Sequence, residues 1–252
     1  MESDYRRRLF STYNATHVFY LDADERAKRD WFSSYAASNY LPLLSQLDRN
    51  NAVVLELACN KGYLLKALSS HGFKKLHGVD LSPDDVETAQ ALVPEATIAY
   101  ADAFDYLGTK TAAFDLIILK AMLEHVRKEE TFALLEQISA ALKTGGLVII
   151  DVPNMDWLFA SHERYMDFTH EVGFTRDSLA QVLRNVFVNV QVVKSKPVLE
   201  SGLKTRVGAL LRPALISLAD VALRIMSEGA SEVWWDSRGI IATGSKSLNQ
   251  NS

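Results

Sequence analysis

Two groups of side chains in this 252-residue chain have the types and positions that chemistry requires. The first group is three carboxylates, Glu56, Asp80 and Asp102, each at or just after the end of a short apolar run. The second is a stretch of ionisable and aromatic residues, ERYMDFTHEVGFT, which contains His170. Carboxylates accept hydrogen bonds from hydroxyls and amines, and histidine can take up a proton near neutral pH. The sequence therefore predicts a binding pocket and a separate acid–base centre.

The three carboxylates predict a nucleoside pocket. Asp80 follows the loop after the first apolar run by about 20 residues, where a carboxylate can bind both hydroxyls of a ribose. Asp102 stands after the third run and can accept from an exocyclic amine. A single aspartate in such a place could equally cap a helix. Three carboxylates at successive strand ends together indicate a nucleoside with a positively charged or amine-bearing tail.

The loop between the first strand and the first helix is poor in glycine. In VLELACNKGYLL it contains only Gly62, with Ala58 and Asn60 where a glycine-dependent nucleotide loop would have further glycines. Alanine is the smallest substitute, and asparagine tolerates a positive φ better than most residues. We expect a turn that approaches a ligand closely but does not wrap a pyrophosphate.

The histidines that could act as bases follow two later strands. His170 lies near Arg164 and Asp167, in a loop whose many ionisable groups are costly to order without a function. The alternative is a surface loop in which Arg164 pairs with Asp167 or Glu171. His125 follows Glu124 directly in MLEHV, beyond the fourth apolar run.

Apolar runs alternate with helical patterns from about residue 53 to about 194, which predicts a doubly wound, mostly parallel α/β sheet. A serine and a proline begin the second helix, and Gly145–Gly146 is expected to end the helix before the fifth strand. The sixth strand alternates apolar and polar residues, as an edge strand does. The expected strands are 52–58, 75–81, 96–102, 114–120, 146–152, 187–193 and 239–245, and the expected helices are 62–71, 83–92, 129–142 and 176–186.

Two segments lie outside this alternating unit. Residues 1–50 are rich in aromatic and charged residues and are expected to form a helical cap, and 196–237 form a helical insert, leaving 51–195 and 238–247 as the main domain. Within the insert, 203–227 has an apolar helical face that Pro213 should divide between two helices. We expect this pair to dock on the body or on a second subunit, as in a homodimer. Peripheral contact with a membrane is the alternative, because basic residues flank the apolar face.

Composition limits the classes of protein. A hydrophobic content of 48% supports a large core, and a net charge of −4 gives no basic footprint for nucleic acid. The single cysteine, Cys59, excludes an internal disulfide and a cysteine-based zinc cluster. No secretory signal and no apolar run of about 18 residues is present, so a cytoplasmic location is expected.

Five motifs resemble the ordered motifs of class I S-adenosylmethionine-dependent methyltransferases: VLELACNKGYLL, LHGVDLSPDDVETAQ, ADAFDYL, FDLIILKAMLEHV and ALKTGGLVIIDVPN. The resemblance covers 52 to about 194 and the last strand. It implies a seven-stranded Rossmann-like sheet with an antiparallel last strand, and S-adenosylmethionine as cofactor. By position it places Glu56, Ala58 and Gly62 at the methionine moiety and Asp80 at the ribose. It also places Leu81 against the adenine face, Asp102 and Ala103 at the adenine edge, and Lys120 along the floor.

The block PN…RYMDFTHEVGFTRDSLAQVL is similar to a bacterial branch of these enzymes associated with surface polysaccharide or lipopolysaccharide synthesis. This narrower resemblance implies O-methylation of a sugar, on a nucleotide sugar or at a glycan end. His170 is then the first choice for a general base, with Asp167 in the same catalytic group. Arg164 would bind an anionic acceptor group, and His125 would shape the cofactor pocket or hold a partner.

Glu124, His125 and His170 also resemble the metal ligands of the small-RNA 3′-terminal 2′-O-methyltransferases, which use two glutamates and two histidines. Ala121 stands where the first glutamate would be, so the three residues could hold a divalent ion but none is expected. The acidic balance disfavours an RNA end as the acceptor. A non-sugar small molecule, a non-catalytic module with this fold and a dinucleotide oxidoreductase are the remaining alternatives.

Overall fold

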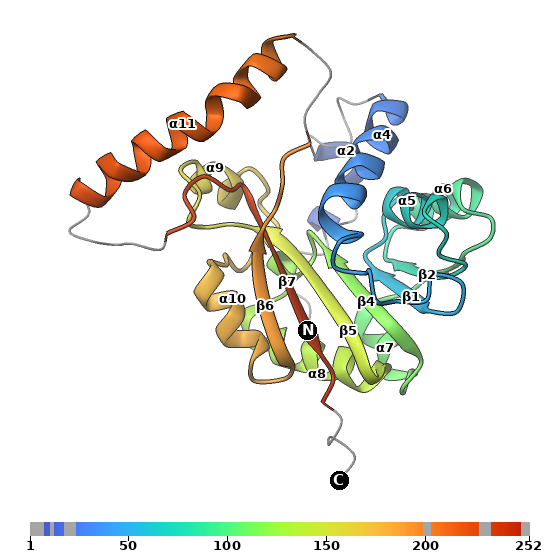
Figure 1. Ribbon diagram of the computed structural model, residues 1–252. Coiled ribbons are helices and arrows are strands. Elements are labelled where there is room, and N and C mark those ends of the chain that lie inside the picture. The colour runs from blue at the N-terminus through green and yellow to red at the C-terminus, as the bar shows by residue number, and fades with distance from the viewer. Residues whose placement is uncertain (1–7, 11–12, 18–23, 199–202, 227–232, 248–252) are drawn as a thin grey trace.

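The computed structural model describes residues 8–10, 13–17, 24–198, 203–226 and 233–247 (Figure 1). Their framework is a seven-stranded sheet with the order β3-β2-β1-β4-β5-β7-β6. β7 pairs antiparallel with both β5 and β6, and every other pairing is parallel. The predicted fold class, including the antiparallel last strand, is thereby confirmed. The strands are β1 Val53–Leu57, β2 Lys75–Asp80, β3 Thr97–Tyr100, β4 Phe114–Lys120, β5 Leu142–Pro153, β6 Val188–Lys194 and β7 Gly239–Ser245.

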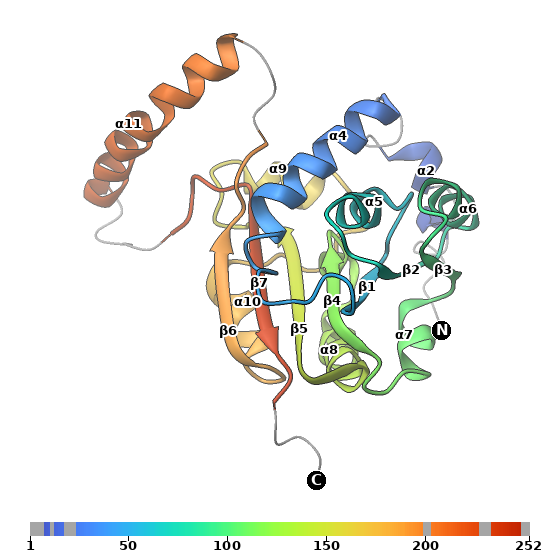
Figure 2. The ribbon, with the colours of Figure 1, turned by 45° about the vertical axis from the view of Figure 1, so that its right-hand side comes forward.

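Helices cover both faces of the sheet, as Figures 1 and 2 show. One face carries α7 Ala103–Gly108, α8 Thr131–Ala141 and α10 Arg176–Leu183, and the other carries α5 Tyr63–Ser70 and α6 Pro83–Leu92 with α4 Glu25–Tyr35. The period of two in the central strands sends alternate residues to the two cores: Leu55 and Ile117 to the first, Val54 and Leu116 to the second. The remaining short elements are α2 Tyr13–Thr16, the π-helical segment Ala36–Tyr40, the 3₁₀ segments Leu123–His125 and Lys128–Glu130, and α9 Ala160–Tyr165.

Local sequence accounts for most of the boundaries. The Ser82 side chain accepts from the backbone N–H of Asp85, and Pro83 begins α6. Thr175 caps α10 in a reciprocal capping box with Ser178. β6 lies at the sheet edge with mostly exposed residues, as its alternating pattern predicted.

The glycine pair before the fifth strand was misinterpreted. α8 ends at Ala141, and β5 begins at once with Leu142, so Gly145–Gly146 does not end the helix. Gly145 instead has a φ of +73° inside the strand, next to a shift in the pairing register between Phe114 and Leu116. A glycine in that conformation fits an irregular strand start as well as a helix end.

The N-terminal helical segment is tied to the middle of the sheet. The hydroxyls of Tyr35 and Tyr40 both donate to Oδ2 of Asp151, at 2.8 Å for Tyr35. Tyr40 is fully buried in the core beside α5. These contacts hold α4 over the carboxyl end of β5.

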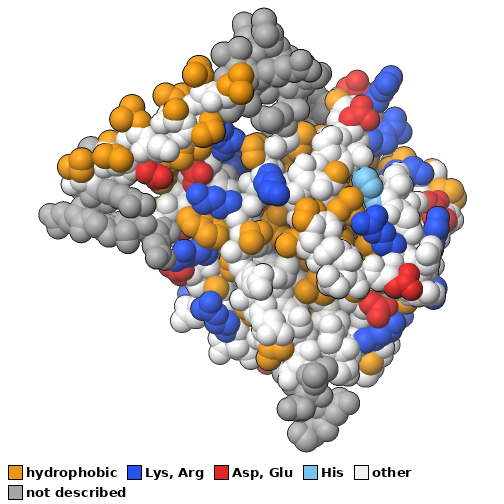
Figure 3. Space-filling model, in the orientation of Figure 1, with side chains coloured by type: hydrophobic (Ala, Val, Ile, Leu, Met, Phe, Trp, Pro, Cys, Tyr) orange, Lys and Arg blue, Asp and Glu red, His pale blue; other side chains and the backbone are white. Residues whose placement is uncertain are grey.

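The insert forms one helix, α11 Leu203–Met226, with Pro213 inside it. The predicted division into two helices is therefore wrong. Both views show α11 projecting from the sheet on the side of α9, and its apolar side chains on the outer surface are exposed rather than packed on the body (Figures 1 to 3). Among the described residues, no helix is long and apolar enough to span a membrane.

Candidate active site

The strand order reverses between β1 and β4, and ligands of open α/β sheets bind at the carboxyl ends of strands flanking such a point. Glu56 lies near the end of β1, Asp80 ends the neighbouring β2, and Asp102 follows β3. These strands are adjacent, and Asp80 pairs in register with Tyr100 at the end of β3. The structure thus brings the three predicted carboxylates to one edge of the sheet.

The loop after β1 has the backbone conformation of a glycine-rich turn although it contains only one glycine. Ala58, Asn60 and Gly62 have φ values of +53°, +49° and +77°. The side-chain oxygen of Asn60 accepts from the backbone N–H of Lys61. The backbone N–H of Asn60 donates to Oδ2 of Asp80 at 2.7 Å. Hydrogen bonds therefore hold this conformation where side chains would otherwise disfavour it.

Gly62 must remain small because α6 packs against it. A Cβ built on Gly62 would lie 3.0 Å from the Cβ and 3.2 Å from the Cα of Ala89. The positive φ adds a second reason for glycine. The loop and helix α6, which follows Asp80, are consequently held at a fixed separation.

Glu56 is buried with an unsatisfied carboxylate oxygen. Oε2 has no hydrogen-bond partner among the described residues. Burial, and then the nearby charge of Asp80, raise the pKa of Glu56 well above its ordinary value, although Lys120 opposes them. An orphaned buried carboxylate facing a second one is suited to receive a cationic ligand.

The other two carboxylates organise the backbone. Asp80 accepts from the N–H of Asn60 and, through Oδ1, from that of Ser82 at 2.9 Å, while burial raises its pKa. Asp102 is the N-cap of α7, with Oδ1 accepting from the N–H of Phe104 at 2.7 Å. Each carboxylate can accept about four hydrogen bonds, so these contacts leave capacity for a ligand. The Leu81 side chain beside Asp80 is exposed, and Ala103 begins α7 in a buried position.

Lys120, at the end of β4, belongs to a polar group beneath this edge. Its Nζ lies 3.3 Å from Oδ2 of Asp151, the atom that Tyr35 and Tyr40 also approach. It also lies 4.5 Å from the centre of the Tyr35 ring. Lys120 therefore joins β4, β5 and the N-terminal helix at the predicted floor.

A second cluster surrounds His170. The rings of His125 and His170 meet edge to face with centroids 4.7 Å apart, and one ligand atom of each lies within 4.8 Å of the other and of a Glu124 carboxylate oxygen. Asp167 joins the cluster through Thr169, whose hydroxyl donates to Oδ1 of Asp167 at 2.6 Å. The sequence-predicted residues around His170 are thus brought together.

The hydrogen bonds define which ring nitrogen of each histidine carries the proton. Nδ1 of His170 lies 2.9 Å from the carbonyl oxygen of Glu163, which can only accept, so Nδ1 is the donor. Nδ1 of His125 lies 2.8 Å from Oγ1 of Thr169, whose own proton goes to Asp167. When either ring is neutral, Nε2 therefore carries its lone pair. Burial, and then the nearby His170, lower the pKa of His125 to about 4.

Glu124 is only 2% exposed, and neither carboxylate oxygen has a hydrogen-bond partner among the described residues. Burial raises its pKa to about 8. Its backbone carbonyl accepts from the N–H groups of Glu171 and Val172, which fixes the loop after α9 against the end of β4. One carboxylate and two histidines in this arrangement have the chemistry of a divalent-metal site.

Arg164 contacts the backbone of its own loop. Its guanidinium donates to the backbone carbonyls of His170, at 2.6 Å, and Glu171, at 3.1 Å, rather than to Asp167 or to a carboxylate of Glu171. These contacts use two of the five guanidinium N–H donors and shape the loop, and binding of an anionic acceptor group by Arg164 stays a prediction. We therefore assign Arg164 to positioning His170.

The loop after α9 borders a hollow of about 520 Å³ lined by Arg164, Tyr165, Asp167, Phe168, His170 and Glu171. The rings of Tyr165 and Phe168 are 77% and 80% exposed. A hollow of this volume with exposed aromatic walls and a few polar groups suits a small acceptor.

Sequence analysis missed two contributors to the His170 cluster. Tyr13 donates to Oδ2 of Asp167 at 2.7 Å, and Nε2 of His17 lies 3.3 Å from the same oxygen. Although burial opposes it, hydrogen bonds from Thr169 and then Tyr13 lower the pKa of Asp167. The i,i+4 spacing of Tyr13 and His17 was the available signal, but nothing in it indicated a partner 150 residues away.

Comparison with known proteins identifies the fold and the family. A family model described as a methyltransferase domain matches residues 24–191. The chain belongs to this methyltransferase family. It is an S-adenosylmethionine-dependent methyltransferase. No curated protein matches its sequence.

Solved structures share the methyltransferase fold at low sequence identity. An S-adenosylmethionine-dependent methyltransferase from Archaeoglobus fulgidus is 18% identical, with a TM-score of 0.64 over 95% of this chain and 99% of that chain. A putative methyltransferase of Haloferax volcanii, in complex with the Trm112 activator, is 15% identical, with a TM-score of 0.62 over 96% and 97%. The Burkholderia thailandensis 1,6-didemethyltoxoflavin-N1-methyltransferase is 18% identical, with a TM-score of 0.61 over 97% and 89%.

The cofactor edge of this methyltransferase fits S-adenosylmethionine. The unsatisfied oxygen of Glu56 suits the cationic methionine end, and the backbone of Ala58 to Gly62 forms a turn that a ligand can approach. Asp80 and Asp102 retain acceptor capacity for the ribose and the adenine amine.

Proposed function

We propose that this methyltransferase transfers a methyl group to a hydroxyl of a carbohydrate, a sugar or a glycan end, bound in the hollow beside His170. The observation that carries the proposal is the tautomer of His170. Because Nδ1 donates to the Glu163 carbonyl, the basic Nε2 is available to take the proton of an acceptor hydroxyl.

S-adenosylmethionine supplies the methyl group on a sulfonium, which is a good leaving group. The chain itself must then hold the acceptor oxygen in line with the methyl carbon. As the oxygen–carbon bond forms and the carbon–sulfur bond breaks, Nε2 of His170 receives the hydroxyl proton. Arg164 and the Glu163 carbonyl keep the imidazole in place during this step.

The lining of the hollow supports a carbohydrate acceptor. Tyr165 and Phe168 offer flat apolar faces at its edge, and the neighbouring polar groups can orient hydroxyls. A hydroxyl acceptor is unactivated near neutral pH and needs a base at the moment of transfer. The His170 cluster supplies that base.

The acceptor class is tested by incubating the protein and S-adenosylmethionine with nucleotide sugars and with glycan extracts. Mass spectrometry should show a product heavier by one methyl group, and fragmentation should place that group on oxygen. A methyl group found only on nitrogen, or no product from any carbohydrate fraction, would contradict the proposal.

A divalent cation is a second candidate for activating the hydroxyl, favoured by the unpartnered oxygens of buried Glu124. Glu124 and the two histidines would be its protein ligands, and the cation would lower the pKa of a bound hydroxyl. Titration with Mn²⁺, followed by electron paramagnetic resonance, should show one site that Glu124→Gln abolishes. Activity that survives a chelator, with no bound Mn²⁺, leaves His170 as the sole activating group.

A further inference from the structure

Helix α11 presents one continuous apolar face to solvent. Leu210, Leu218 and Ile225 follow one another at intervals of eight and seven residues and are 80%, 70% and 77% exposed. Leu211, Leu215 and Val221 lie on the same face and are also exposed. Figure 3 shows hydrophobic side chains along α11 at the outer margin of the molecule. Scattered exposed leucines need no explanation, but a stripe of six on one helix does.

The opposite face of α11 is turned toward the body. Arg212, Ile216, Asp220 and Leu223 recur at helical spacing and are all partly buried. The outward and inward faces are therefore distinct, and the outward apolar stripe is not the side by which the helix attaches to the protein.

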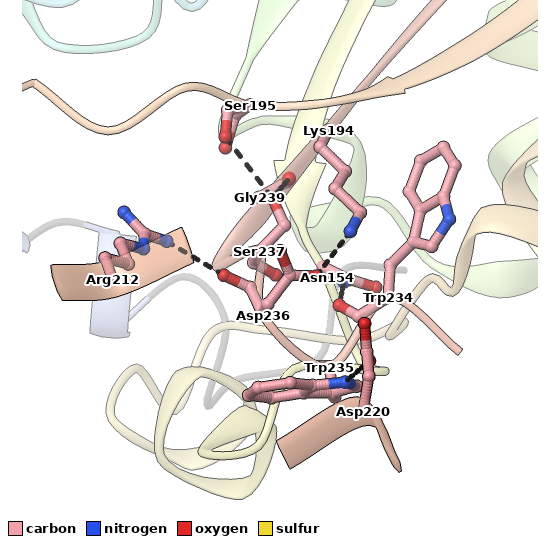
Figure 4. Close-up of polar contacts among 10 residues, drawn as sticks. All are labelled: Asn154, Lys194, Ser195, Arg212, Asp220, Trp234, Trp235, Asp236, Ser237 and Gly239. Carbon is pink, nitrogen blue, oxygen red and sulfur yellow. Dashed lines mark hydrogen bonds and ion pairs between the residues drawn. The ribbon is translucent and has the colours of Figure 1, made fainter. Parts of the chain in front are cut away.

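Polar contacts hold α11 in this orientation, as Figure 4 shows. Nη2 of Arg212 donates to the carbonyl of Asp236 at 3.1 Å, and the indole N–H of Trp235 donates to Oδ1 of Asp220 at 2.6 Å. The segment that receives them is itself fastened to the sheet, because Lys194 pairs with Asp236 and Asn154 donates to the carbonyl of Trp234. The helix is thus attached through the face that carries Arg212 and Asp220, and its apolar stripe is left facing outward.

Charge indicates what covers the apolar stripe. The helix contains Lys204, Arg206, Arg212 and Arg224 against the single acidic residue Asp220, so its formal charge is four minus one, or +3, in a chain of net charge −4. Two copies of this helix, each carrying +3, would repel one another when packed together. An anionic lipid surface attracts the positive charge and accepts the apolar side chains.

We propose that α11 binds the surface of an anionic membrane, with its apolar stripe in the headgroup and acyl boundary. A helix that lies in this interface needs an apolar face, basic residues and a polar side directed away from the lipid, and α11 has all three. Its 24 residues, about 36 Å long, can lie flat along such a surface. This inference goes beyond the proposed methyl transfer and does not require it.

The test is sedimentation of the full chain with vesicles. The wild-type protein should sediment with vesicles of equal parts phosphatidylglycerol and phosphatidylcholine, and much less with phosphatidylcholine alone or at high salt. The double variant Leu218→Glu/Ile225→Glu should lower the partition coefficient about tenfold or more, since two exposed apolar side chains leave the interface.

A matched control separates the apolar stripe from net charge. Ala91 on α6 and Ala133 on α8 are exposed helical residues, so Ala91→Glu/Ala133→Glu adds the same two negative charges elsewhere. This control should sediment like the wild type. All variants should bind S-adenosylhomocysteine equally in calorimetry. Equal binding would show that the variants are folded and that a loss of vesicle binding arises from α11.

Three results would overturn the proposal. They are no sedimentation of the wild type with anionic vesicles, an equal loss in the control, and a dimer in light scattering that Leu218→Glu/Ile225→Glu converts to a monomer. The last result would assign the stripe to a second copy of the chain.

Discussion

At the scale of single residues, the main result is a histidine whose proton position is set by a backbone carbonyl. His170 donates from Nδ1 to Glu163, and Arg164 holds the carbonyl of His170 itself. The basic nitrogen is therefore fixed by the fold of one short loop. A variant of this residue should affect the chemical step far more than binding of the cofactor.

His170→Ala should lower kcat about 10²- to 10⁴-fold, the usual contribution of a general base. His162→Ala is the control, because His162 lies in α9 of the same region but is exposed. Both variants should retain their affinity for S-adenosylhomocysteine in calorimetry. Unchanged turnover of His170→Ala across the accessible pH range would remove His170 from the mechanism.

Glu56 should release a proton when the cofactor binds. Its pKa is raised by burial, so it keeps its proton at pH values where an exposed glutamic acid has lost it. A cationic methionine end favours the ionised carboxylate, so binding should drive the proton off. Calorimetry with S-adenosylhomocysteine in buffers of different ionisation enthalpy measures this release. Glu56→Gln should abolish it and weaken binding, while Glu87→Gln, at an exposed site on α6, should change neither.

Sequence analysis identified the site residues at the ends of strands and missed the site residues from a distant part of the chain. Glu56, Asp80 and Asp102 could be placed together because parallel strands end at one edge. Tyr13 and His17 could not, because their roles depend on a contact with Asp167 across the fold. The contacts of Arg164 with the carbonyls of His170 and Glu171 were not predicted, because a guanidinium can donate to a backbone carbonyl as well as to a carboxylate.

At the scale of elements, the turn after β1 shows that residues other than glycine can adopt the backbone conformation of a glycine-rich turn. Ala58 and Asn60 adopt positive φ, as a glycine would. Their strain is offset by hydrogen bonds from the turn to Asp80 and to the Asn60 side chain. Only Gly62, which faces α6, has no substitute.

Gly62→Ala should destabilise the fold by about 1–3 kcal/mol, because a methyl group would meet Ala89 and the backbone has a positive φ. Gly108→Ala is the contrast, since nothing lies within 4 Å of its added Cβ. Denaturant unfolding should show little change, or a gain, at Gly108. Equal effects of the two substitutions would contradict the packing argument.

Periodicity predicted most strands to within one or two residues, and it failed where a breaker residue was taken as decisive. Pro213 removes one hydrogen bond and costs about 3 kcal/mol, but a 24-residue helix has many other turns to offset that loss. Gly145 failed for a related reason, because a positive φ suits a strand irregularity as well as a helix end. A residue's conformational preference does not say which neighbouring element will use it.

At the scale of the whole molecule, the sheet with its two cores and the helix α11 are energetically separate. Neither core contains a described residue of α11. Its attachment includes polar contacts to 235–236. The sequence could indicate a helical insert but not whether its apolar face points toward the body or toward solvent, because an apolar stripe is consistent with both.

Replacing residues 200–232 by a flexible linker should leave the melting temperature and the affinity for S-adenosylhomocysteine nearly unchanged. The two cores and the cofactor edge lose no described residue. Scanning fluorimetry and calorimetry test this, and vesicle binding should be lost in the same protein. A fall in melting temperature of more than a few degrees would show that α11 supports the body.

The position of β7 has a consequence for synthesis on the ribosome. β7 lies between β5 and β6, although it is the last of the sheet's seven strands to be made. Until residues 239–245 leave the exit tunnel, β6 has no neighbour to pair with and β5 exposes one open side. The sheet can therefore be completed only after residues 239–245 have been made. A premature stop codon that removes them would release a product in which β5 and β6 each have an unpaired edge.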